Sequence, residues 1–180
     1  MNTATQNLEN DHVNILRLID VMEKMVNVKS TNIEHFEKAV NLIKSYADSF
    51  HHTKEENLLF PMMIKKGFSK GQGPIAVMLQ DHTEGRNYAK GLTLEIISYK
   101  EGNEKALAEV YENMRGSIVL LRNHIAKENN VLFRMADNAL SEAEHQELLK
   151  EFAKVENSSY CGGALKDCIT AIERLESAYK

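Results

Sequence analysis

Residues 51–62 read His-His-Thr-Lys-Glu-Glu-Asn-Leu-Leu-Phe-Pro-Met, and residues 124–135 read His-Ile-Ala-Lys-Glu-Asn-Asn-Val-Leu-Phe-Arg-Met. Aligned without a gap, the two segments share a histidine, a Lys-Glu pair and a Leu-Phe pair. A weaker match precedes them, because residues 8–12 (Leu-Glu-Asn-Asp-His) resemble residues 78–82 (Met-Leu-Gln-Asp-His). The chain therefore contains two copies of one unit, in which a helix with a lone histidine precedes a helix with a His-x-x-x-Glu motif.

Each His-x-x-x-Glu motif places its two polar side chains one turn apart on the same face of a helix. His51 with Glu55, and His124 with Glu128, can therefore each direct an imidazole nitrogen and a carboxylate at a common point. Two such helices that face each other supply two carboxylates, which can bridge a pair of cations. The spacing is thus typical of a dinuclear site inside a helical bundle.

A single histidine or a single motif of this kind is more often an ordinary core or surface feature. Here the polar residues fall on the inward stripes of four successive helices in a repeated order, and buried carboxylates without partners are costly. We therefore predict a metal site whose ligands are His12, His51, Glu55, His82, His124 and Glu128. A nitrogen and oxygen donor set without thiolate suits two iron ions, with manganese or zinc as alternatives.

Helical periodicity runs along the whole chain, and the period-two alternation of strands is nearly missing. A first helix is expected over about residues 5–28, and loops are expected at residues 67–73 and 102–103. Two capping boxes are expected to open further helices, at Thr31 with Glu34 and at Ser141 with Glu144. Short connections favour antiparallel neighbours.

We predict an all-α fold in a single domain, residues 1–180. An up-down four-helix bundle over about residues 5–135 is followed by an additional C-terminal helix pair over about 141–180. The apolar stripe of this pair needs a surface, and either covering the bundle or forming a homodimer interface satisfies it.

Residues outside the repeat receive simpler interpretations. Cys161 and Cys168 have neither the spacing of a redox motif nor that of a zinc ribbon, so we predict two small buried side chains. His35 and His145 lie among charged residues and are predicted to be surface histidines.

The composition, with 43% hydrophobic and 27% charged residues, is that of an ordinary globular protein. A net charge of -4 and scattered basic residues argue against a nucleic-acid partner. No apolar run approaches the length of a membrane span, and the first residues lack the basic and apolar regions of a signal peptide. The expected compartment is the cytoplasm.

The order H…HxxxE…H…HxxxE, with a Leu-Phe pair after each HxxxE, resembles the hemerythrin-like (HHE cation-binding) family over residues 8–135. This resemblance implies a four-helix bundle with a non-haem di-iron centre that can bind oxygen. It also implies that Glu55 and Glu128 bridge the metals. The histidines that match the family pattern are His12, His51, His82 and His124.

One position departs from the oxygen-carrying members of that family, which have a further histidine one turn after the one on the third helix. Arg86 stands there in this chain, which argues against plain reversible oxygen carriage. Arg86 either pairs with a carboxylate that orients a ligand or reaches the surface.

His52 is an alternative ligand, since some family members use the residue directly after the motif histidine. Its offset of about 100° from His51 around an α-helix instead favours the rim of the site. Glu56 shares that side of the helix, and it either contacts solvent or supports a ligand.

Three functions are compatible with such a centre. It binds dioxygen, nitric oxide or a peroxide for sensing, storage or delivery; it acts as an enzyme on these molecules; or metal occupancy itself is the signal in iron handling. A histidine-rich ligand set favours the first function over a carboxylate-rich oxidase site. We therefore expect a non-haem di-iron binding protein rather than an enzyme.

Overall fold

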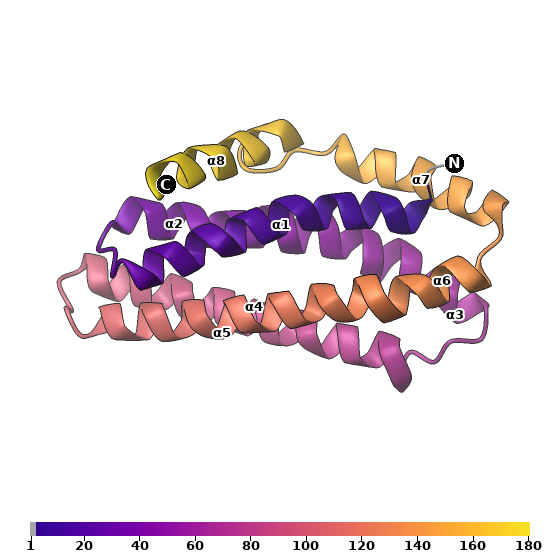
Figure 1. Ribbon diagram of the computed structural model, residues 1–180, viewed down its shortest axis with the longest axis horizontal. Helices are drawn as coiled ribbons and strands as arrows, with labels where there is room; N and C mark the ends of the chain where they lie inside the picture. The colour runs from indigo at the N-terminus through magenta and orange to yellow at the C-terminus, as the bar shows by residue number, and fades with distance from the viewer. Residues whose placement is uncertain (1–2) are drawn as a thin grey trace.

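The computed structural model describes residues 3–180, which fold almost entirely into helices (Figure 1). Over that range no strand forms, and the sole β-type contact is an isolated bridge between Tyr160 and Gly163. The predicted all-α class is therefore confirmed. None of these helices is long and apolar enough to cross a membrane.

Four helical rods make up the bundle (Figure 1). The first rod is α1 (Ala4–Asn27), and the third is α4 (Gly73–Lys100). The second is a nearly continuous run of α2 (Ile33–Leu42), the π-helical segments η1 (Ile43–His52) and η2 (Glu55–Leu59), and α3 (Phe60–Lys65). The fourth joins α5 (Ala106–Lys127), the π-helical η3 (Glu128–Leu132) and α6 (Phe133–Ala139).

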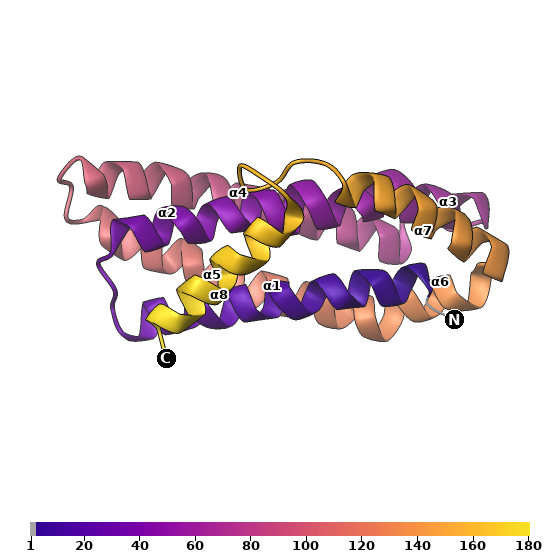
Figure 2. The same cartoon turned by 90° about the horizontal axis from the view of Figure 1, so that it is seen from above.

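The C-terminal pair, α7 (Glu142–Glu156) and α8 (Leu165–Ala178), packs onto this bundle. Figure 2 shows α8 crossing obliquely over α1 and α2, and an ion pair of 2.6 Å between Arg17 and Glu176 ties α8 to α1. Of the two alternatives for this pair, the structure shows the one in which it covers the bundle.

Local sequence explains where the helices begin. Ser141 and Glu144 form the predicted capping box at the start of α7. The predicted box at Thr31 is wrong, because Asn32 caps α2 by accepting a hydrogen bond from the backbone N–H of His35. Asparagine is at least as good an N-cap as threonine, so the helix begins one residue later than expected.

The apolar core is divided into two clusters. One, around Ile19, Phe36 and Ile172, fills the end of the bundle beneath α8. The other, around Leu8 and Phe152, fills the opposite end beneath α7. On each rod the predicted ligands lie between the residues of the two clusters, so they form a buried polar layer across the middle of the bundle.

The prediction for the cysteines is wrong. Cys161 and Cys168 form a disulfide across the turn between α7 and α8, with their Cα atoms 5.5 Å apart. Cys168 is buried in the first turns of α8, and Cys161 has a left-handed backbone (φ 53°) that turns the chain back toward it. The connectivity of this turn, which sequence spacing does not reveal, brings the two thiols together.

Candidate metal centre

The bundle brings all the predicted ligands into one layer. The histidines come from α1 (His12), η1 (His51 and His52), α4 (His82) and α5 (His124), and every one of them is buried. The two glutamates, Glu55 and Glu128, begin η2 and η3 and are fully buried.

These side chains form two groups, in each of which the candidate ligand atoms lie within 4.8 Å of one another. The first group is His12, His51, Glu55 and Glu128, and the second is His52, Glu55, His82 and His124. Glu55 belongs to both groups, because its Oε1 is 3.6 Å from His51 Nε2 and its Oε2 is 3.3 Å from His82 Nε2. This is the arrangement of a carboxylate that bridges two cations.

Glu128 lies between the two groups in a similar way. Its Oε2 is 3.2 Å from the Nε2 atom of His12 and 3.2 Å from the Nε2 atom of His124. The Nε2 atoms of His12 and His51 are 2.9 Å apart, and those of His82 and His124 are 3.2 Å apart. Imidazole nitrogens and carboxylate oxygens therefore meet at two points in the bundle interior.

The opposite ring nitrogens of the motif histidines bond to aspartates. His51 Nδ1 is 3.1 Å from Asp11, and His124 Nδ1 is 3.2 Å from Asp81. A carboxylate only accepts, so each Nδ1 donates its hydrogen and the Nε2 lone pair points to the centre. Each aspartate directly precedes a lone histidine in the sequence, and the repeat therefore extends to these supporting residues.

The lone histidines are held by the residues that follow the two glutamates. His12 Nδ1 donates to Asn129 Oδ1 at 2.7 Å, and His82 Nδ1 donates to Glu56 Oε1 at 2.6 Å. Glu56 thus supports a candidate ligand, which was one of its two predicted roles.

The aromatic residues of the two Leu-Phe pairs cover the lone histidines. Phe133 stacks on His12 with ring centroids 5.5 Å apart, and Phe60 stacks on His82 at 6.0 Å. Each phenylalanine therefore packs on the imidazole of the other unit, which gives a structural reason for the repeated Leu-Phe pair.

The donor chemistry of this layer fits a pair of metal ions. All four carboxylate oxygens of Glu55 and Glu128 are buried, and none has a hydrogen-bond donor anywhere in residues 3–180. The Nε2 atoms of the surrounding imidazoles point at the same places, so acceptor atoms predominate there. Such a cluster is costly unless a cation compensates it, and nitrogen with oxygen donors suits iron, manganese or zinc.

Burial and charge separate the pKa values of the two glutamates. Burial alone raises the pKa of Glu55, but His51 and the neighbouring imidazoles outweigh it and hold this pKa well below its ordinary value. Burial and the negative charge of Glu55 raise the pKa of Glu128 well above its ordinary value. Before metal binds, Glu128 therefore keeps a proton while Glu55 is ionised.

His12, His51, His52 and His82 also have pKa values outside their ordinary range. Burial lowers the pKa values of His12 and His51, and it lowers the pKa of His52 to about 3. These imidazoles are therefore neutral, as metal coordination requires. Burial acts in the same direction on His82, but the carboxylates of Glu55 and Glu56 outweigh it and raise the pKa of His82 to about 9.

For His52 the sequence left a ligand and a rim position open; in the structure His52 is only 5% exposed and belongs to the second donor group. The helix here is π-helical, with hydrogen bonds that span one residue more than in an α-helix. The wider turn lets both His51 and His52 face the interior. Asp48 lies 3.3 Å from His52 Nδ1 and so holds Nε2 toward the centre.

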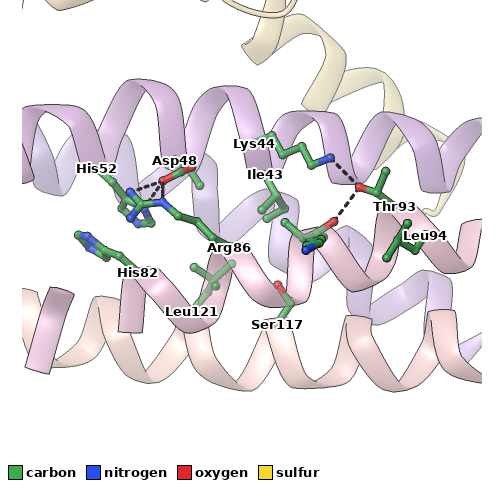
Figure 3. Close-up of a pocket in the computed structure, with 14 residues that line it drawn as sticks. Ile43, Lys44, Asp48, His52, His82, Arg86, Thr93, Leu94, Ser117 and Leu121 are labelled. Atoms are coloured by element: carbon green, nitrogen blue, oxygen red, sulfur yellow. Dashed lines mark hydrogen bonds and ion pairs between the residues drawn. The ribbon is translucent and has the colours of Figure 1, made fainter. Parts of the chain in front are cut away.

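Arg86 pairs with carboxylates that orient candidate ligands, which was the first of its two predicted roles. Its guanidinium bonds Asp48 Oδ1 through Nε at 2.9 Å (Figure 3). It also bonds Glu56 Oε1 through Nη2 at 2.7 Å. Both carboxylates also hold a histidine, so Arg86 positions His52 and His82 through them. The carboxylates lie between the arginine and the metal-binding layer, which reduces repulsion between the guanidinium and bound cations.

The two histidines outside the repeat lie away from this layer. His35 is half-buried, and its Nδ1 is 2.9 Å from the hydroxyl of Tyr179. The surface prediction for His145 is wrong: this residue is 5% exposed, and its Nδ1 accepts a hydrogen bond from the backbone N–H of Ala4. It is buried because α7 folds back over the start of α1.

Apart from Glu56 and Arg86, sequence reasoning missed the residues that orient the ligands. A signal for most of them lies in the repeat, since Asp11 and Asp81 occupy matched positions, as do Glu56 and Asn129. Asp48 has only the four-residue spacing to His52 as a signal.

A family model described as the hemerythrin HHE cation binding domain matches residues 3–136. The chain belongs to this family. The match covers the first three rods, the fourth rod as far as the middle of α6, and all seven donor residues of the hemerythrin-like bundle. This is a cation-binding family, in agreement with the donor chemistry of the layer.

Curated relatives of this hemerythrin-like chain include proteins from Escherichia coli O157:H7 and Shigella boydii serotype 18, both named iron-sulfur cluster repair protein YtfE. Each is 40% identical to it over 96 residues, which is 49% of this chain and 41% of the relative. The chain thus matches less than half of the length of these relatives. No solved structure matches it significantly.

Proposed function

We propose that this chain binds two iron ions between the two donor groups and that the resulting centre takes dioxygen or a related diatomic molecule such as nitric oxide. The observation that carries the proposal is the convergence of imidazole nitrogens on Glu55 and Glu128, whose four buried oxygens have no donor in the described chain. Glu55 and Glu128 are the proposed bridges.

The two halves of the centre offer different numbers of imidazoles. The first group contributes His12 and His51, whereas the second contributes His52, His82 and His124. With one protein ligand fewer, the first group leaves more room for an exogenous molecule. Phe133, stacked on His12, makes that side apolar and limits access of water. A bound iron pair would supply reversible redox chemistry and an electrophilic site for such a molecule.

The test is anaerobic loading with ferrous iron, followed by absorption spectra under argon, after oxygen is admitted, and again under argon. The proposal predicts a near-ultraviolet or visible band that appears with oxygen and disappears on its removal. Irreversible oxidation, or gas evolution on addition of peroxide, would contradict a binding function and favour an enzyme.

A second candidate function is iron handling in iron-sulfur cluster repair, and the names of the relatives favour it. In this function the bound iron is cargo, and Glu55 and Glu128 release it to a damaged cluster protein. The experiment is to incubate the iron-loaded chain with a [4Fe–4S] enzyme that has been partly demetallated. Recovery of enzyme activity beyond that given by equal free iron supports repair, and equal recovery argues against it.

A further inference from the structure

A groove separates η1 from α4, with Ser117 and Leu121 of α5 at its floor (Figure 3). Its volume is about 280 Å³, whereas about 10–15 Å³ of such space holds one water molecule. A diatomic molecule would therefore fill only a small part of the groove. The space suits a ligand of about ten non-hydrogen atoms.

Side chains that cross between the two helices bound the groove at both ends. Arg86 bonds Asp48 at the end near His82, and Lys44 Nζ donates to the hydroxyl of Thr93 at 2.6 Å at the other end. Arg86 and Thr93 are separated by about 10 Å along α4, from the rise of an α-helix. A ligand between the two crossings is therefore limited to roughly that length.

The middle of the groove is apolar. Ala47 of η1 and Ala89 of α4 line it, and both are buried. Because their side chains are small, the space between the two helices stays open. Ser117 places a hydroxyl-bearing side chain at the floor. An aliphatic chain fits the surface between the two alanines.

The end of the groove farthest from the metal layer carries positive charge. Lys44 lies at this end, and Lys90 of α4, about one turn before Thr93, also lines the groove. Neither lysine forms an ion pair with a carboxylate of residues 3–180. The lining carboxylate, Asp48, is already engaged by Arg86 and His52 at the opposite end. An anion is therefore favoured beside the two lysines, and a cation is disfavoured there.

We propose that this groove binds a small anionic amphiphile, a monocarboxylate with an aliphatic chain of about eight carbons. The aliphatic chain lies between Ala47 and Ala89, and the carboxylate lies beside Lys44 and Lys90. This inference is independent of the proposed function, because it requires neither a diatomic ligand nor release of iron.

The test is calorimetric titration of the metal-loaded protein with octanoate, and separately with octanol and octylamine. We expect saturable binding of one octanoate per chain, with octanol and octylamine at least about tenfold weaker. The double variant Lys44→Gln/Lys90→Gln should weaken octanoate binding about tenfold through loss of both charges. The matched control Lys38→Gln/Lys100→Gln, on the same two helical rods but outside the groove, should leave it unchanged.

The filling variant Ala89→Leu should also weaken octanoate binding, but the lysine pair decides the test if that variant fails to fold. Absorption spectra recorded in the same titration distinguish the groove from the metals. Octanoate that changes the spectrum and binds the lysine variant as well as the wild type would bind the metals and overturn the proposal. No saturable binding, or equal binding of octanol, would also overturn it.

Discussion

The two glutamates at the centre, Glu55 and Glu128, have the same burial but opposite protonation before metal binds. Replacing the protonated Glu128 by glutamine keeps its shape and charge, so we expect the metal-free protein to lose less than about 1 kcal/mol of unfolding free energy. Glu55→Gln removes an ionised carboxylate that the imidazoles stabilise and should cost more. Chemical denaturation of the metal-free variants measures this difference.

In the presence of iron both variants should bind fewer metal ions, because each change removes a proposed bridge. Metal analysis after gel filtration measures the content per chain. If either variant keeps two tightly bound irons, that glutamate is not a bridge.

His52 is matched in the repeat by Ile125, which indicates that isoleucine is compatible with this position of the bundle. We predict that His52→Ile retains two metals but changes the absorption spectrum and the reaction with oxygen, through loss of one imidazole from the second group. His35→Gln serves as the control, because His35 lies outside both groups. A spectrum of His52→Ile identical to wild type would mean that His52 is not a ligand.

Much of the candidate site could be predicted from the identity of single residues, because the same ligand motif occurs in both copies of the repeat. His51 with Glu55 and His124 with Glu128 are aligned copies, and the structure places both pairs in one layer. His52 could not be placed, since its position depends on π-helical hydrogen bonding in η1 that residue spacing does not reveal.

At the scale of helices, the repeat is less symmetric than the sequence indicates. Lys54 and Lys127 are aligned, and each pairs with an aspartate that holds a motif histidine. The Lys54 side chain is 0% exposed, 2.5 Å from Asp11, and its ammonium lies 4.3 Å from the centre of the Phe50 ring. The Lys127 side chain is 41% exposed. The difference arises because α7 covers the rod that carries Lys54 but not the one that carries Lys127.

We predict that Lys54→Met costs about 3–5 kcal/mol of unfolding free energy in the metal-free protein at pH 8, because it leaves Asp11 ionised and buried without its partner. Lys127→Met should cost less than about 1 kcal/mol. Urea denaturation of both variants makes the comparison. Equal losses of unfolding free energy in the two variants would contradict the proposed difference between the buried Lys54 and the exposed Lys127.

The loss of unfolding free energy caused by Lys54→Met should become smaller as the pH falls. Burial raises the pKa of Asp11 to about 6, against the lowering effect of Lys54, so loss of the lysine raises it further. A folded-state pKa above the unfolded one means that the native state takes up the proton first, and protonated Asp11 needs no ammonium partner. The difference in unfolding free energy between Lys54→Met and wild type should therefore be smaller at pH 5 than at pH 8. A larger difference at pH 5 would contradict the role of ionised Asp11 as the partner of Lys54.

Across the whole molecule, the helical class and the positions of most helices could be predicted because apolar periodicity is local. The packing of α7 and α8 could not, since an apolar stripe does not identify the surface that covers it. That packing explains the burial of His145.

The disulfide between α7 and α8 closes a short loop that contributes no donor residue to the metal-binding layer. We predict that the double variant Cys161→Ser/Cys168→Ala lowers the unfolding free energy by about 2–3 kcal/mol, the loop-closure value for this length. The metal content should not change, because the donor residues come from α1 to α5 and from η3. Thermal denaturation and metal analysis test the two parts, and loss of metal would show that the C-terminal pair supports the centre.

The central claim is that the repeated unit builds one dinuclear iron centre. The most direct measurement is native mass spectrometry during anaerobic titration with ferrous iron. The account predicts that the mass rises by two irons per chain and then stops. Saturation at one iron, or no stoichiometric uptake, would contradict it and would leave the histidines and glutamates as a buried polar network alone.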